Sequence, residues 1–392
     1  MILKTKKYTL LLILLIIPLA GAGVDIHVPS LPSILLYFNA TSVQIKYSVT
    51  IYLLGYGLGQ FIVGSLSDSF GRRSLLLPGL ILYALICLFS IYSTSIMFFL
   101  ITRFLQGIIV AGPAIAIKAC ISDNYQGKEL EKVSSLSVIA WACGPILAPF
   151  IGGYLQHFFE WKACFIFLCI YSSLLFVVAL FFLPESKTDM ELLNLSNMSK
   201  NYALVMKNRP FWGCAIITGI TYSIMAVFNV MGPFLLQVTL GYSSITFGHI
   251  AMILGFSFFI GGILNRYFVA KISMRKIFII ATSIWCISQI IVFLITLKIK
   301  FTLISLLIPL CIIFVLGGII QPTVFSIVLG LFPKLGGTVN SILGIIVMTI
   351  TALATTIASH LGTLNLLPLM FFYLVLAFVC LLTYFTFIKN KS

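Results

Sequence analysis

Charged residues are scarce in this sequence. Only 8% of its 392 residues are Asp, Glu, Lys or Arg, whereas 61% are hydrophobic, and the mean hydropathy is +1.16. This composition lies far outside the range of soluble globular proteins and indicates an integral membrane protein. The apolar runs are about twenty residues long, as transmembrane helices require, and the alternating segments of a membrane β-barrel are absent. We therefore predict an all-α membrane protein.

The usual signatures of catalytic and metal sites are also missing. The nine cysteines include no C-x-x-C pair and the four histidines lie in four different segments, so neither a disulfide framework nor a metal site is predicted. There are no paired acids, no H-E-x-x-H motif, no phosphate-binding loop and no soluble domain. We expect neither an enzyme nor an ATP-driven pump, and no cofactor.

The net charge of +15 does not indicate a nucleic-acid partner, because no soluble face carries the basic residues. Their positions follow the membrane instead. With both termini placed in the cytoplasm, nearly all Lys and Arg residues fall on the cytoplasmic side, as the positive-inside rule requires. The exceptions are Lys46, Lys162, Lys298 and Lys300, placed outside, and Arg103, placed within the membrane. We predict a multi-pass protein of a bacterial inner membrane.

Twelve transmembrane helices are expected. The first extends from Tyr8 to about Val28, although the preceding lysines and Ala20-Gly21-Ala22 imitate a cleavable signal peptide. We read it as a retained helix, because cleavage would leave an odd number of spans. The others are expected near residues 44–66, 75–92, 96–118, 133–155, 161–183, 211–230, 247–268, 277–297, 303–328, 339–361 and 366–387.

A polar segment near mid-chain is the one plausible domain boundary. Charge density rises from Glu185 to Arg209, and part of a loop pattern in the first half recurs about half a chain length later, at Gly262-x-Leu264. We predict an N-terminal six-helix bundle over residues 1–184, a cytoplasmic linker over 185–209 and a C-terminal six-helix bundle over 210–392, the two halves enclosing a central cavity. Any carboxylate chemistry must lie in the first half, because no acid follows Glu191.

A short polar loop separates the second and third expected helices. Residues 64–73 read G-x-L-x-D-x-x-G-R-R. The spacing of Asp68 and Arg72 suits a local ion pair. The pattern resembles the signature loop between helices two and three of the major facilitator superfamily of transporters. That resemblance implies a conformational latch formed by Gly64, Asp68, Gly71, Arg72 and Arg73.

Two charged residues lie within apolar runs of the first half. Asp25 is the only acid placed deep in a membrane segment, and such residues are functional candidates because burying their charge is costly. Arg103 lies in Arg103-Phe104-Leu105-Gln106-Gly107, which resembles the superfamily's helix-four motif associated with proton coupling. We predict that Asp25 exchanges a proton and Arg103 tunes it. The alternatives are an interfacial Asp25 and an Arg103 that snorkels to the headgroups.

The fifth expected helix contains two prolines and three glycines within residues 142–153, which predicts a kinked and closely packed helix. The segment resembles the superfamily's antiporter motif, with Gly144, Pro145, Pro149, Gly152 and Gly153 matching and Ala148 departing. Together with Asp25, Pro29-Ser30-Leu31-Pro32, Trp161 and Leu183-Pro184-Glu185-Ser186, it resembles the bicyclomycin-resistance (Bcr/CflA) branch of drug:proton antiporters. Branch members often carry a second acid earlier in helix one, which residues 12–18 lack.

These features predict a secondary transporter that exports drugs or other small amphipathic compounds by alternating access, driven by the proton gradient and acting as a monomer. The alternative is an uptake or export carrier for one metabolite, such as an amino acid or a siderophore, on the same fold. Aromatic and amide side chains of three helices are candidates to line the substrate site, with packing as the alternative role for each: Tyr52, Tyr56, Trp141, Tyr222, Phe228 and Asn229.

Overall fold

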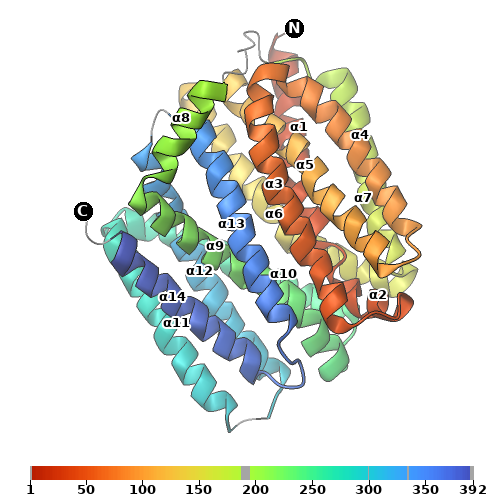
Figure 1. The fold of residues 1–392 in the computed structure, drawn as a ribbon, viewed down its shortest axis with the longest axis vertical. Helices are drawn as coiled ribbons and strands as arrows, with labels where there is room; N and C mark the ends of the chain where they lie inside the picture. The colour runs from red at the N-terminus through yellow and green to blue at the C-terminus, as the bar shows by residue number, and fades with distance from the viewer. Residues whose placement is uncertain (1, 187–194, 299, 333–334, 389–392) are drawn as a thin grey trace. The chain divides into compact units, whose positions relative to one another are not determined.

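A computed structural model of the chain describes residues 2–186, 195–298, 300–332 and 335–388, without the side chains of 2–7, 64–70, 195–198, 329 and 336. Within these ranges the chain is helical and contains no strand. It divides into two compact units, Met1–Leu195 and Ser196–Ser392. Figure 1 colours the first from red to yellow-green and the second from green to blue.

The first unit contains six long helices. Its elements are α1 (Ile2–Asp25), a 3₁₀ turn η1 (Val28–Ser30), α2 (Leu31–Tyr37), α3 (Ser42–Phe70), α4 (Arg72–Ile91), α5 (Ile96–Asn124), α6 (Gly127–Phe159) and α7 (Lys162–Phe182). Local sequence explains several boundaries. Thr41 and Gln44 form a capping box at the start of α3, and Ser95 caps α5. Gly71, with a φ of 85°, supplies the left-handed backbone that separates α3 from α4.

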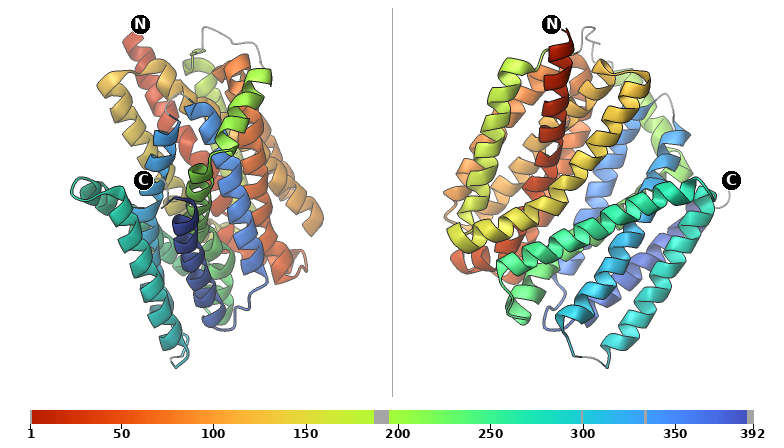
Figure 2. Two further views of the ribbon diagram at one scale, coloured as in Figure 1. Left: turned by 60° about the vertical axis from the view of Figure 1, so that its left-hand side comes forward. Right: turned by 180° about the vertical axis from the view of Figure 1, so that it is seen from behind.

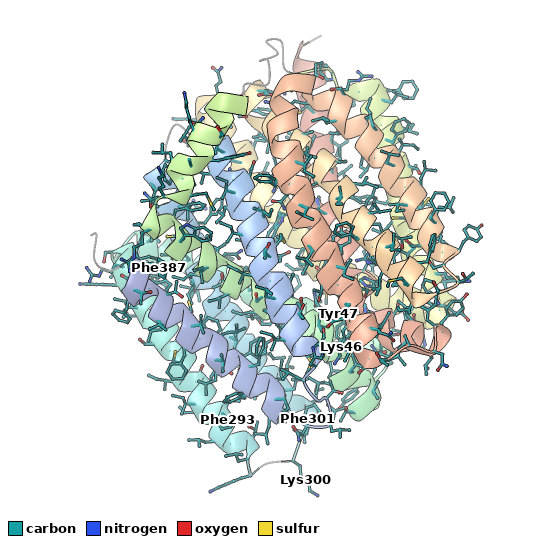
Figure 3. The ribbon with its side chains drawn as sticks, viewed as in Figure 1. Lys46, Tyr47, Phe293, Lys300, Phe301 and Phe387 are labelled. Atoms are coloured by element: carbon teal, nitrogen blue, oxygen red, sulfur yellow. The ribbon has the colours of Figure 1, made fainter. Side chains whose placement is uncertain are left out.

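The second unit repeats this arrangement. A short helix, α8 (Leu195–Met206), comes before α9 (Arg209–Pro233), a π-helical segment η2 (Phe234–Thr239), α10 (Ser244–Val269), α11 (Met274–Thr296), α12 (Leu303–Leu331), α13 (Gly336–Ser359) and α14 (Leu367–Phe387). The sequence did not predict α8, which lies in the expected polar linker. Figure 3 labels Lys300, at the connection between α11 and α12. It also labels Phe293 of α11, which packs on Phe371 of α14.

Helices pack in the same order within each unit. In the first, α1 packs on α6, α3 on α5, and α4 on α5 and α7. The corresponding pairs of the second unit are α9 with α13, α10 with α12, and α11 with α12 and α14. Seen from behind, the red α1 lies between the gold α6 and the yellow-green α7 (Figure 2). Each unit is therefore one copy of a six-helix repeat.

Small residues allow the closest helix approaches. A Cβ at Gly107 of α5 would collide with the Tyr52 carbonyl of α3, and a Cβ at Gly318 of α12 would collide with the Phe258 carbonyl of α10. The glycines thus lie at equivalent helix pairs of the two units, where membrane helices need small residues to bring their backbones together.

Eleven helices of the described residues are long and apolar enough to span a membrane. The 29-residue α3 is the twelfth long helix, and the side chains of its last seven residues lie outside the description. The predicted fold class, an all-α membrane protein with twelve spans in two six-helix halves, is confirmed.

Candidate functional site

Arg103 lies near the start of α5, inside the first unit, and is fully buried. Its Nη2 donates a hydrogen bond to the Gly23 carbonyl of α1 at 2.8 Å, and its Nε donates to the Ser48 carbonyl of α3 at 3.4 Å. Its guanidinium carbon lies 4.4 Å from the centre of the Tyr52 ring, a cation–π contact. One α5 side chain thus joins three helices. In this conformation the guanidinium is held inside the unit.

A second layer of polar residues holds the guanidinium in place. Nη1 of Arg103 donates to Oε1 of Gln106, one turn further along α5. Nε2 of Gln106 donates to Ser90 Oγ of α4 at 2.8 Å, and Ser90 also bonds Thr102 at 2.9 Å. Gln106, Ser90 and Thr102 are themselves buried. Because buried polar groups are costly unless paired, this chain of bonds fixes the orientation of Arg103.

Asp25 is the last residue of α1, two positions after Gly23, and only 4% of it is exposed. The two predicted proton-coupling residues are therefore neighbours, and both are buried. His27 follows, with Nε2 3.0 Å from Ser48 Oγ. Ser48 consequently contacts His27 through its side chain and Arg103 through its carbonyl.

Tyr52 belongs to the same cluster. Its hydroxyl donates to the Ala20 carbonyl of α1 at 3.1 Å, and the side chain is fully buried. A Cβ at Gly23 would collide with the hydroxyl oxygens of both Tyr52 and Tyr83. Gly23 is therefore needed where α1 meets these rings. In this conformation Tyr52 supports Arg103 and α1 and has no exposed surface.

The predicted antiporter motif forms the contact between α6 and α1. A Cβ at Gly144 would lie 2.9 Å from the Pro18 carbonyl oxygen, and a Cβ at Gly152 would collide with the Ile26 carbonyl. Pro145 Cδ would be 3.1 Å from a Cβ at Gly21. Pro149 and Gly153 are buried in the same helix. The glycines of α6 thus bring its backbone against the segment of α1 that ends at Asp25.

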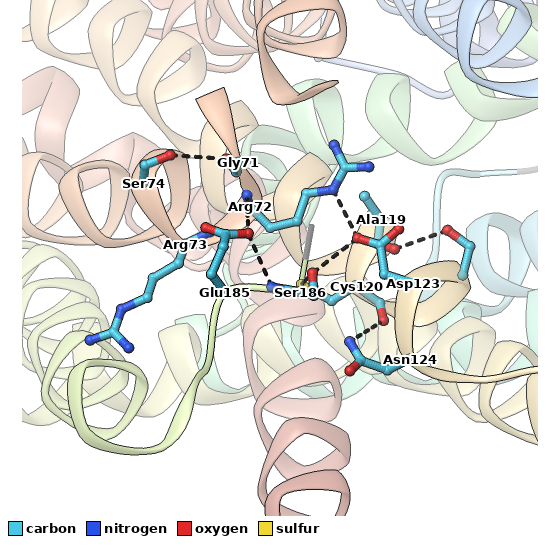
Figure 4. A network of polar contacts seen from close by, with 11 residues as sticks. Gly71, Arg72, Arg73, Ser74, Ala119, Cys120, Asp123, Asn124, Glu185 and Ser186 are labelled. Carbon is cyan, nitrogen blue, oxygen red and sulfur yellow. Dashed lines mark hydrogen bonds and ion pairs between the residues drawn. The ribbon is translucent and has the colours of Figure 1, made fainter. Parts of the chain in front are cut away.

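Three of the predicted latch residues, Gly71, Arg72 and Arg73, lie at the start of α4 (Figure 4). The backbone N–H groups of Arg72 and Arg73 donate to the Glu185 carboxylate at 2.8 and 3.0 Å. A Cβ at Gly71 would lie 2.8 Å from the same carboxylate. Glu185, just beyond α7, therefore caps α4, where a negative charge also complements the helix dipole.

Four more bonds tie this junction to neighbouring helices. Arg72 Nε forms an ion pair with Asp123 of α5 at 3.0 Å, and Ser186 Oγ donates to the same carboxylate at 2.9 Å. Arg73 donates to the carbonyls of Leu183 and Leu180 at the end of α7. The start of α4 and the ends of α5 and α7 are thus held together. Gly64 and Asp68 lie outside the described side chains, so the predicted pair of Asp68 with Arg72 does too.

The other substrate candidates lie in several environments. Tyr56 is 8% exposed, while Trp141 of α6 and Tyr222 of α9 are partly exposed. Phe228 of α9 stacks on Phe247, with ring centres 5.6 Å apart, and meets Phe314 edge-on at 6.2 Å. Its neighbour Asn229 is 4% exposed. Phe228 therefore packs in the second unit's core in this conformation.

Sequence reasoning assigned no role to several residues that complete these sites. In the sequence, Glu185 and Ser186 stand out only as part of a segment that resembles the Bcr/CflA branch and as the start of the polar linker, Gln106 only as part of a motif, and Asp123 not at all. Each is far from its partner along the chain, apart from Gln106. Among the described residues, no three His, Cys, Asp or Glu side chains gather as metal ligands would.

Comparisons with known proteins agree with this architecture. An uncharacterized transporter of Rickettsia felis is 27% identical over 372 residues, covering 91% of this chain and 92% of its own length. A bicyclomycin resistance protein homolog of Haemophilus influenzae is 25% identical over 354 residues, covering 89% of this chain and 88% of its own.

The crystal structure of a D-xylose–proton symporter superposes with a TM-score of 0.80 over 98% of each chain, at 16% identity, which shows a shared fold. The family model described as Major Facilitator Superfamily matches residues 13–355. That match covers most of the sequence, and the chain therefore belongs to the Major Facilitator Superfamily of membrane transporters.

Proposed function

We propose that this transporter is an antiporter that expels drugs or other small amphipathic compounds in exchange for protons. The observation that carries the proposal is the position of Asp25. It ends the helix whose backbone packs on the proline- and glycine-rich α6 and whose Gly23 carbonyl accepts a hydrogen bond from Arg103. The similarity to a bicyclomycin resistance protein homolog supports a drug as the exported compound.

The proton would act through the balance of charge around Arg103. An ionised Asp25 attracts the guanidinium, and protonation of the carboxyl removes that attraction. Arg103 then depends on its neutral partners, the carbonyls of Gly23 and Ser48 and the amide of Gln106. Hydrogen bonds of a charged group are worth about 1.5–3 kcal/mol each. Gaining or losing one such bond at Arg103 is therefore enough to shift the equilibrium between two conformations of the transporter.

The packing of α1 on α6 offers a route from this charge to a change of shape. Gly144 and Gly152 hold the two backbones in contact, which leaves no side chain between them to absorb a shift of α1. A movement at Asp25 is therefore passed directly to α6. Alternating access, in which the two halves rock against each other, would follow from such a shift.

The junction at Arg72 would act as the latch. Glu185 and Asp123 hold the start of α4 by charge-assisted bonds that can break and reform as the helix ends separate. The exported compound, if cationic, would compete with the proton for the charge of Asp25. We place this junction and both termini on the cytoplasmic side of a bacterial inner membrane, and we propose a monomer.

The experiment is compound accumulation in an efflux-deficient bacterium that expresses the wild type, Asp25→Asn or the control Glu131→Gln, whose side chain is exposed on α6, with and without a protonophore. We expect low accumulation of at least one amphipathic compound in the wild type, abolished by the protonophore and by Asp25→Asn. If the protein is present in the membrane but changes the accumulation of no compound, the result would instead favour a carrier for one metabolite.

A further inference from the structure

A cavity of about 430 Å³ opens at one end of the first unit, away from the latch. It is lined by residues of α2, the end of α6 and the turn into α7: Ser33, Leu36, Tyr37, Gln156, Glu160 and Trp161. The latch lies at the far end of α7, whose 21 residues rise about 30 Å. In Figure 1 this end of the unit carries α2, opposite the N-terminus.

Aromatic rings form one wall of this cavity, and they already hold a cation. The rings of Tyr37 and Trp161 meet edge to face with centres 5.2 Å apart. Lys162 Nζ lies 5.1 Å from the centre of the first ring and 5.8 Å from that of the second. The protein's own ammonium group thus shows that these rings accept a cation here.

The other wall offers groups that attract positive charge. Glu160 is exposed, and among the described residues its carboxylate makes no ion pair or hydrogen bond. Its φ of 65° is a conformation that residues other than glycine seldom adopt. Gln156 donates through Nε2 to Ser33 Oγ at 2.9 Å, which leaves its buried Oε1 without a donor in the described part of the chain.

We propose that this cavity binds the primary ammonium group of an amphipathic molecule. The ammonium lies beside the Glu160 carboxylate and, after a rotation of the Gln156 side chain, donates to Oε1. The apolar portion covers Leu36 and the two rings, and Lys162 is displaced from their faces. Such a group comes from two sources, an amine dissolved in water or the ethanolamine headgroup of a membrane lipid. This site does not depend on the proposed proton-driven export.

Opposite effects of two substitutions test the site. The purified protein, in nanodiscs of phosphatidylcholine, is titrated with octylamine while tryptophan fluorescence is followed, with octanol as the uncharged control. Glu160→Gln should weaken octylamine binding roughly fivefold, the order of an exposed ion pair. Lys162→Met keeps the aliphatic stem but removes the competing ammonium, so it should strengthen binding roughly threefold. The exposed pair on α6 supplies matched controls, Glu131→Gln and Lys132→Met, which should leave binding unchanged.

A second set of nanodiscs, containing phosphatidylethanolamine, separates the two sources. Weaker octylamine binding there than in phosphatidylcholine alone, and only with Glu160 present, identifies the lipid headgroup as an occupant. Equal binding in both identifies amines from water. The proposal is overturned if octylamine does not bind the wild type, if it binds no better than octanol, or if Glu160→Gln and Lys162→Met leave its affinity unchanged.

Discussion

The contact between α1 and α6 leads to a quantitative prediction for Gly152→Ala. A methyl group at this position would overlap the Ile26 carbonyl oxygen, a backbone atom that cannot turn aside as a side chain can. The two helices must therefore separate. Overpacking of this kind costs typically 1–3 kcal/mol, and we expect the upper end of that range for Gly152. At Gly144 the new methyl would be 2.9 Å from the Pro18 carbonyl oxygen, so a smaller shift suffices and we expect about 1 kcal/mol.

Gly262 of α10 is the matched control. A Cβ there would have no neighbour within 4 Å, so Gly262→Ala adds only helix propensity and should stabilise the protein by roughly 0.5–1 kcal/mol. Thermal unfolding of the three variants in the same detergent gives the test. With a shift of about 2–4 °C per kcal/mol, Gly152→Ala should unfold at least 6 °C below the wild type. If Gly152→Ala unfolded at the same temperature as Gly262→Ala, the close backbone contact between Gly152 and Ile26 would be refuted.

Two further predictions concern the charged sites. Arg103→Lys should lower the free energy of unfolding by about 2–4 kcal/mol and export by more than tenfold, because one ammonium cannot bond the Gly23 and Ser48 carbonyls and Gln106 together. If this variant unfolded and exported like the wild type, the proposed role of the Arg103 hydrogen bonds would be wrong. Glu185→Gln should cost about 1 kcal/mol, since a neutral amide caps the start of α4 less well than a carboxylate. Thermal unfolding measures the second effect, and a loss no greater than that of the exposed control Glu131→Gln would argue against the cap.

The number and approximate extent of the long helices could be predicted from the sequence, because apolar runs long enough to cross a membrane have few other structures open to them. Their ends were less predictable. Helix α6, the fifth predicted span, begins at Gly127 rather than near Val133, since the charged turn containing Lys128 and Glu131 continues the helix past the apolar run. Similarly, α4 begins at Arg72, where the distant Glu185 completes its cap.

The candidate site was predictable only in part. Motifs pointed to Asp25, Arg103 and the glycines of α6, because unusual residues stand out in an apolar sequence. Their partners could not be predicted, since bonds such as Arg103 to the Gly23 carbonyl or Arg72 to Asp123 join residues far apart in the chain. The acceptors are often backbone carbonyls, which every residue carries and no motif reveals.

We propose that export is driven by protons and depends on Asp25. The most direct measurement is proton release from proteoliposomes of defined orientation when an exported compound is added, comparing the wild type with Asp25→Asn. We expect compound-dependent proton movement in the wild type and none in the variant, with both proteins equally folded. Equal proton movement in the two, or compound transport by the wild type without any proton movement, would contradict it.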